Sequence, residues 1–194
     1  MSRSEAAQRA LILHRSHQTV EAIIRQLTQI GMSAEQHWPE LPHDLRPAGY
    51  AVVFFDADMG HDEQFPWLAG EAPIPTIALI GSEAPGRIAW AIKHGADAAL
   101  LNPVAGGGIS ASVLLAREAF ARRQVLRQEL GAARSRLEKR EVLATATAFL
   151  MHSEGLSPHD AFQQLRLRAM AQRLTIEVMA ERIVERTQRR EDRA

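Results

Sequence analysis

The sequence predicts an α/β fold: a doubly wound parallel sheet of five strands, then a long helix, then a small module of three helices. Residues 8–112 contain short apolar runs without polar alternation, separated by segments of helix length. The stretch 109–151 contains no proline. Two helix-start signals follow Gly155. We therefore divide the chain into three parts at residues 8–112, 113–142 and 143–188.

Four apolar runs and one weaker segment, Ser33–His37, are predicted to form the sheet, with helices on both of its faces. Parallel strands read as continuous apolar runs because both faces of the sheet are covered. Helices are expected from Val20 to Ile30 and from Ile88 to His94, each followed by a glycine that stops it. Functional side chains gather at the carboxyl ends of such strands. The predicted strands are Ala10–Leu13, Ser33–His37, Tyr50–Phe55, Thr76–Ile80 and Ala98–Leu101.

Three motifs in this first part resemble those of the receiver domains of two-component response regulators. They are FFDADMG at 54–60, PTIALI at 75–80 and GADAALLNPV at 95–104. The resemblance covers roughly residues 8–116 and implies a receiver-like, flavodoxin-like sheet. In a working receiver, an aspartate at the end of the third strand accepts a phosphoryl group, and Asp56 occupies that position.

The groups that support Asp56 in a working receiver are replaced in this chain. The acidic pair that holds Mg²⁺ during phosphoryl transfer is replaced by His14 and Arg15. The switch hydroxyl is replaced by Ile80, and the lysine near the end of the domain by Asn102. We therefore interpret this part as a pseudo-receiver and expect Asp56 to be a strand-end carboxylate. Phosphorylation of Asp56 is kept as an alternative.

The connector, residues 113–142, is predicted to be a helix with a coiled-coil seam. Good helix formers dominate it, and apolar or small side chains recur with alternating steps of three and four. This pattern favours a parallel homodimer, while a single helix that packs back on the first part is the alternative. The seam positions are Ala119, Arg123, Leu126, Leu130, Ala133, Leu137, Arg140, Ala144, Thr147 and Met151.

The last part is predicted to place two short amphipathic helices against the end of the long one. Gly155 is suited to the left-handed residue that follows a helix. Ser157, Pro158 and Asp160 form the start of the next helix, with proline at its first position. Thr175 is expected to cap the third helix.

This pattern resembles the ANTAR domain, a three-helix RNA-binding module of bacterial antiterminators. The matching motifs are AxAFLM at 146–151, AFxxLRxxAM at 161–170 and MAExIV at 179–184. Two positions depart from the family, which usually has Lys and Gly where this chain has Thr147 and Ala148. A pseudo-receiver, a coiled coil and a terminal ANTAR module together resemble the aliphatic amidase regulator family. That resemblance implies transcription antitermination through paired hairpin loops of a leader RNA.

The resemblance also implies which residues contact RNA. Loop RNA is recognised through splayed bases, phosphate contacts and stacking on planar side chains, and arginine supplies two of these. Arg166 is the residue we expect most strongly to contact RNA, whereas helical spacing favours a packing role for Phe162 beside Leu165 and Ala169. Ala146 could be small to let helices approach. The candidate RNA-binding residues are Ala146, Thr147, Met151, Phe162, Arg166, Arg168, Met170 and Arg173.

Composition agrees with a regulator that binds a polyanion. Residues 1–112 hold 7 basic and 12 acidic side chains, a net charge of −5, whereas residues 113–194 hold 16 and 11, a net charge of +5. No cysteine, membrane-length apolar run or signal-peptide core is present, so we expect a cytoplasmic protein. We expect no catalytic residue, metal or cofactor. The expected partners are leader RNA hairpins, a second copy of the chain and a ligand-sensing regulatory protein. A dimeric protein-binding adaptor is the remaining alternative.

Overall fold

The computed structural model describes residues 9–15, 17–104 and 107–191, so the first residue of the predicted pseudo-receiver, Gln8, lies outside the described part. The chain forms two compact units, Met1–Val125 and Leu126–Ala194. The boundary falls inside one helix, α4 (Ile109–Glu154).

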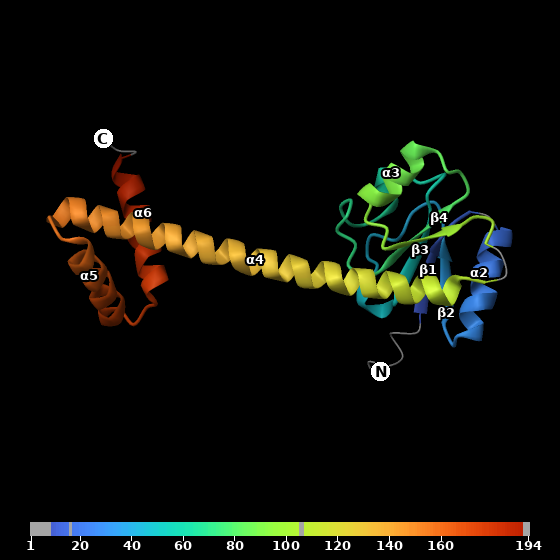
Figure 1. Cartoon of the computed structure of the whole chain (residues 1–194), viewed down its shortest axis with the longest axis horizontal. Helices are drawn as coiled ribbons and strands as arrows, with labels where there is room; N and C mark the ends of the chain where they lie inside the picture. The colour runs from blue at the N-terminus through green and yellow to red at the C-terminus, as the bar shows by residue number, and fades with distance from the viewer. Residues whose placement is uncertain (1–8, 16, 105–106, 192–194) are drawn as a thin grey trace. The chain divides into compact units, whose positions relative to one another are not determined.

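The first unit is built on a five-stranded parallel sheet (Figure 1). The strand order β2-β1-β3-β4-β5 is that of the flavodoxin-like doubly wound fold. The predicted fold class is confirmed, and all five predicted segments form strands. Their bounds are β1 (Arg9–Leu13), β2 (Ser33–His37), β3 (Val52–Asp56), β4 (Thr76–Ile80) and β5 (Ala98–Leu101).

The two faces of this sheet are covered differently. One face packs against α2 (His17–Gln29) and the start of α4, whose Ile109, Val113 and Ala116 are buried with it. The other face packs against α3 (Pro85–Lys93) and against long loops that hold only the short 3-10 helices η1 (Pro47–Gly49) and η2 (Asp62–Gln64). The expectation of helices on both faces is therefore confirmed, although α3 shares the second face with loops.

Proline explains the loops on the second face. The β2–β3 connection contains Pro39, Pro42 and Pro47, and the β3–β4 connection contains Pro66, Pro73 and Pro75. Proline lacks the N–H that a helix interior needs and clashes with the preceding turn. Aromatic and apolar loop side chains fill the space instead, including Leu41, Tyr50, Phe65 and Trp67.

Arg123 ties α4 to the sheet. Its Nη1 lies 2.7 Å from Oδ1 of Asp97 and donates to the carbonyl of Gly95 at 3.0 Å. Burial raises the pKa of Asp97, although Arg123 and the amide of Thr76 favour its ionised form. The side chain of Arg123, at a predicted seam position, is therefore held by contacts within the first unit.

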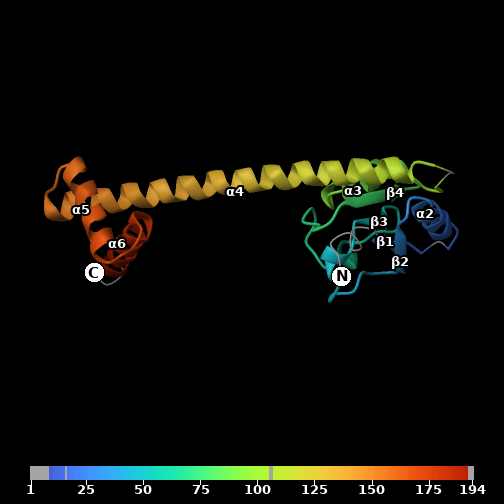
Figure 2. The ribbon, with the colours of Figure 1, turned by 90° about the horizontal axis from the view of Figure 1, so that it is seen from below.

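The second unit consists of the C-terminal end of α4 with α5 (Pro158–Ala171) and α6 (Ile176–Glu191) (Figures 1 and 2). Gly155 has φ +64°, as expected after a helix end. The Ser157 hydroxyl accepts the amide of Asp160, and the Thr175 hydroxyl accepts that of Val178. Both predicted caps are therefore confirmed. The core of this unit contains Ala146, Leu150, Ala161, Leu165, Ala169, Met179, Ala180 and Ile183.

Candidate nucleic-acid interface

Asp56, at the end of β3, is a buried carboxylate whose two oxygens both have neighbours. Its Oδ1 accepts the backbone N–H groups of Asp58 at 2.9 Å and Met59 at 3.1 Å. Its Oδ2 lies 3.4 Å from Nε2 of His14. The residue is 4% exposed. Asp56 thus holds the turn that follows its own strand, which is the structural role expected from the sequence.

Two of the residues that replace receiver groups, His14 and Asn102, form a network with Thr19 beside this carboxylate. Asn102 Nδ2 lies 3.2 Å from Nε2 of His14, and Asn102 Oδ1 accepts the hydroxyl of Thr19 at 2.8 Å. His14 and Thr19 are buried. Within the described residues, no group of three or more His, Cys, Asp or Glu side chains could hold a metal ion. The strand ends therefore carry packed, mutually bonded polar groups.

Asp58 fastens this region to the loop after β4. Its Oδ2 accepts the amide of Gly81 at 2.7 Å, and its Oδ1 accepts that of Ser82 at 3.0 Å. A Cβ atom at residue 81 would lie 2.7 Å from the same Oδ2, so the close approach requires glycine. A side-chain carboxylate thus bridges the ends of β3 and β4.

In the second unit, a row of exposed side chains runs along α5. Phe162 is 44% exposed and Met170 is 65% exposed, and Arg166 between them is exposed too. Steps of four residues place these three on one helix face. Arg173 follows just beyond the helix end and is exposed as well. We call Phe162, Arg166, Met170 and Arg173 the α5 row.

The position of Phe162 corrects the packing role that its spacing favoured. Leu165 and Ala169 are buried as expected, but Ala161 takes the core position one turn earlier. A large aromatic ring is therefore left partly in solvent beside Arg166.

Arg173 adopts an unusual backbone conformation. Its φ is +55°, and it alone among the described non-glycine residues has a positive φ. Its amide donates to Met170 and the amide of Leu174 donates to Ala169, the bonding pattern of a helix end that favours glycine. A residue with a Cβ atom costs about 1 kcal/mol there. The chain therefore keeps an arginine where glycine would be more stable.

The other candidate RNA-binding residues have contacts inside the unit. Ala146 is fully buried, and Met151 is partly buried against the same core. The Thr147 hydroxyl donates to the carbonyl of Leu143 at 2.7 Å. Arg168 Nη2 contacts both carboxylate oxygens of Glu154, at 2.6 and 2.8 Å, and so links α5 to α4.

Two residues near the α5 row were not predicted from the sequence. Leu167 is 58% exposed and directly follows Arg166. Glu154 precedes its partner Arg168 by 14 residues and a helix break, so no spacing rule linked them. The available signal for this pair was the position of Glu154 in the last turn of α4. A residue there lies close to the next helix when the connecting turn is short.

Two family models match the chain. The model of the AmiR N-terminal domain matches residues 8–117, which is more than half of the chain. The chain belongs to the AmiR N-terminal family. The ANTAR domain model matches residues 131–184, which include the α5 row.

One regulator and two solved response-regulator structures are similar to this chain over most of its length. The chain is 25% identical over 175 residues to the aliphatic amidase regulator of Pseudomonas aeruginosa, covering 90% of this chain and 89% of the relative. Among solved structures, the response regulator StyR aligns with a TM-score of 0.45 at 13% identity, covering 92% of this chain and 98% of the other. FixJ of B. japonicum aligns with a TM-score of 0.44 at the same identity and coverage.

The chain is therefore an ANTAR antiterminator of the AmiR type: an RNA-binding antitermination regulator with a receiver-like domain. Over the described residues, no helix has the length and apolar character that crossing a bilayer requires.

Proposed function

We propose that this regulator binds paired hairpin loops of a leader RNA through the α5 row and so prevents a terminator from forming. The observation that carries the proposal is the row itself. Along one helix face it combines an exposed aromatic ring, an arginine and a thioether, and a second exposed arginine follows just beyond the helix end. Unpaired loop bases stack on aromatic rings and on guanidinium planes, and phosphates bind arginine.

Each side chain of the row has a distinct task. Phe162 and Met170 contact base faces, since exposed apolar surface on this face has no other partner among the described residues. Arg166 and Arg173 bind phosphates or stack on bases. Within the described part of the chain, neither guanidinium forms an ion pair or a side-chain hydrogen bond, in contrast to that of Arg168. Their charge is therefore open to an anionic partner.

A second copy of the chain pairs through α4. Leu126, Leu130 and Leu137 are 64%, 53% and 64% exposed, and they lie on the predicted seam with Ala133. Leucines repeated at this spacing on a long helix favour a coiled coil. Because Arg123 is bound to Asp97, the paired segment begins after it. Two ANTAR modules in one dimer then bind two hairpins with a gain in effective concentration.

The pseudo-receiver serves as the control and dimerisation domain and works without phosphorylation. Support comes from Asp56, whose carboxylate is buried and has neighbours at both oxygens. A phosphoryl group there would have to displace His14 or the turn amides, with no acidic pair for Mg²⁺. Control by a ligand-sensing partner protein fits this arrangement.

The test is binding of the full chain to a two-hairpin leader RNA, with one-hairpin and duplex RNAs as controls. We expect preference for two hairpins, and an affinity that falls as salt rises because phosphate contacts release counterions. Arg166→Ala should weaken binding about 10-fold or more and make the salt dependence shallower by about one phosphate contact.

Arg25→Ala is the matched control, because it removes the same charge from an exposed position on α2. Equal affinity of the unaltered chain for all three RNAs would refute the proposal. So would an equal effect of the two substitutions.

A further inference from the structure

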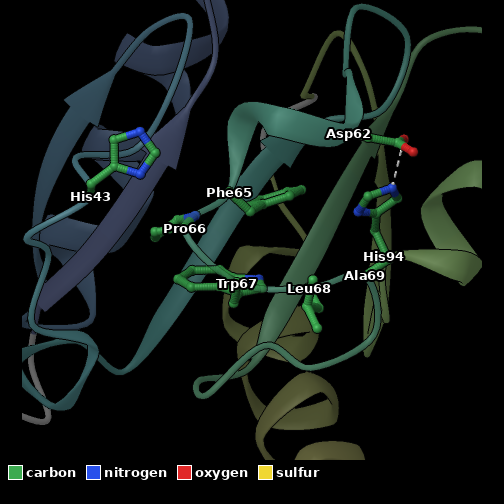
Figure 3. A pocket seen from close by; sticks show the side chains of 8 residues that line it. All are labelled: His43, Asp62, Phe65, Pro66, Trp67, Leu68, Ala69 and His94. Atoms are coloured by element: carbon green, nitrogen blue, oxygen red, sulfur yellow. Dashed lines mark hydrogen bonds and ion pairs between the residues drawn. The ribbon is translucent and has the colours of Figure 1, made fainter.

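The first unit contains a surface hollow with a volume of about 500 Å³. It lies where the β3–β4 connection passes the end of α3 (Figure 3). Small-molecule sites in proteins have volumes of roughly 300–1,000 Å³. The hollow has the size of such a site, and it lies on the loops that replace helices on the second face of the sheet.

Aromatic rings form the wall of the hollow and are fixed by one another. Phe65 and Trp67 stack with ring centroids 5.5 Å apart and an interplanar angle of 21°. Phe65 also packs against His94 at 5.7 Å and edge-on against Phe55 at 5.4 Å. Phe65 is only 7% exposed, whereas Leu68 at the rim is 72% exposed. The half-buried Trp67 ring, held in place by Phe65, therefore offers a preformed apolar surface suited to a flat ligand.

Asp62 determines the hydrogen-bonding character of the polar side. Its Oδ1 accepts Trp90 Nε1–H at 2.8 Å and lies 3.1 Å from Nε2 of His94, and its Oδ2 accepts Lys93 at 3.2 Å. These hydrogen bonds, that of Trp90 first, lower the pKa of Asp62 to about 2. The carboxylate is ionised at neutral pH, so Nε2 of His94 must be the donor.

The second ring nitrogen of His94 is then an acceptor directed at the hollow. When Nε2 carries the proton of a neutral imidazole, Nδ1 accepts. Figure 3 shows this nitrogen on the side of the ring away from Asp62, toward Phe65 and Leu68. Among the described residues, none forms a hydrogen bond with this nitrogen. The hollow thus has a flat apolar wall and an acceptor at its inner end.

Charge restricts the ligand further. Among the lining residues, Asp62 carries a formal negative charge, and no Lys or Arg lines the hollow. Lys93 balances Asp62 from outside the lining. An anionic ligand would meet a carboxylate and a ring acceptor, both of which repel it.

We propose that this hollow binds a small planar molecule that carries an N–H donor, neutral or cationic, and that the pseudo-receiver is thereby a ligand-binding domain. The flat body of the ligand lies against Phe65 and Trp67, and its N–H donates to Nδ1 of His94. This inference stands apart from the RNA-binding proposal and does not depend on it.

The probes are benzamide, benzamidine and benzoate, which share one flat shape and differ in charge and donors. The full chain is labelled with ¹⁵N, and the indole N–H signals of its three tryptophans are followed by NMR. Benzamide and benzamidine should shift the signal of Trp67, which lines the hollow, and that of Trp90, whose indole N–H donates to the lining residue Asp62. The signal of Trp38, which neither lines the hollow nor contacts Asp62, should stay in place. Benzoate should bind at least about 10-fold more weakly. Equal binding of the three probes, or no shift at millimolar benzamide, overturns the proposal.

Two substitutions locate the binding. Trp67→Leu removes the stacking wall at a half-buried position and should weaken benzamide about 3- to 10-fold. His94→Phe keeps an aromatic ring but removes the acceptor, so it should reduce the preference for benzamide over benzoate, while the repulsion by Asp62 remains. Trp38→Phe is the control and should leave both affinities unchanged. Retained benzamide affinity in Trp67→Leu, with the other amide signals in place, would also refute the site.

Discussion

The strand ends around Asp56 and the α5 row differ in how their polar groups are used. At the strand ends, Asp56, Asp58 and Asn102 contact other parts of the same unit and are packed against them. Along α5, Arg166 and Arg173 extend into solvent beside a partly exposed Phe162. Since polar groups without internal partners are the ones free to bind another molecule, the comparison separates a structural role from a binding role.

The largest expected effect is on the proposed dimer, which would bring two α5 rows together. Leu130→Glu with Leu137→Glu places like charges on the α4 seam and should give monomers. Affinity for two-hairpin RNA should fall about 100-fold or more, since effective concentration is lost. One-hairpin affinity should change little. Analytical ultracentrifugation and RNA titration measure both quantities.

Gln128→Glu adds a charge to α4 at an exposed position off the seam and is the control for the pair. If the double variant stays dimeric, α4 is not the pairing helix.

Removal of the aromatic ring tests the binding side of the comparison. Phe162→Ala should weaken hairpin binding by about 1–3 kcal/mol, because one stacked base loses its platform. The free energy of unfolding should change little, because the ring is 44% exposed. Titration of loop RNA and urea unfolding give the two values. Leu167→Ala, exposed but outside the row, should leave the RNA affinity unchanged; an equal loss there would assign the effect to general surface contacts.

Removal of Asp56 tests the structural side. Asp56→Ala leaves the amides of Asp58 and Met59 without their acceptor and should lower the free energy of unfolding by about 1–3 kcal/mol. Hairpin affinity of the folded variant should stay the same. Acetyl phosphate should add no mass to the unaltered chain. A phosphorylated Asp56 that alters RNA binding would contradict the pseudo-receiver.

Arg173 combines a structural role with the proposed binding role, and substituting it should have a smaller effect than substituting Phe162 or Asp56. Arg173→Gly should raise the free energy of unfolding by up to about 1 kcal/mol, because glycine accepts the left-handed backbone at no steric cost. The same substitution should weaken RNA binding. Urea unfolding and RNA titration should therefore move in opposite directions. Unchanged RNA binding in a more stable variant would remove Arg173 from the interface.

The smallest expected effect is on how stability depends on pH under acidic conditions. Asp62 has a pKa lowered from 3.8 to about 2, so the stability it contributes is present above pH 4 and lost as the pH falls through 2. Asp62→Asn should make the unfolding midpoint less dependent on pH in this window. Glu63→Gln is the control, because the neighbouring Glu63 carboxyl is 89% exposed, and it should leave this pH dependence unchanged.

Much of the fold followed from local patterns. The strands were readable because apolar runs such as Thr76–Ile80 are buried on both faces of the sheet. The helix caps at Ser157 and Thr175 were readable because capping depends on the residues next to the helix start. Such features require no knowledge of contacts that are distant in sequence.

The features that the sequence did not predict depend on contacts between residues that are distant in the chain. Helical spacing placed Phe162 in the core because it does not distinguish which edge of an apolar stripe faces α4 and α6. The pairs Arg168–Glu154 and Asp62–His94 join residues from different elements. The hollow at Trp67 arises from a proline-rich loop whose path follows from packing rather than from any local pattern.

The seven residues from Asp56 to Asp62 carry three carboxylates, each bound to a different part of the first unit. Asp56 faces His14 after β1, Asp58 holds the loop after β4, and Asp62 holds the end of α3. Phosphoryl transfer at Asp56 would need an acidic group in place of His14, which would put two carboxylates together in a buried site. It would also need room for the phosphoryl group beside Asp56. We expect each of these changes alone to lower the free energy of unfolding, because each removes contacts that now hold the buried carboxylate.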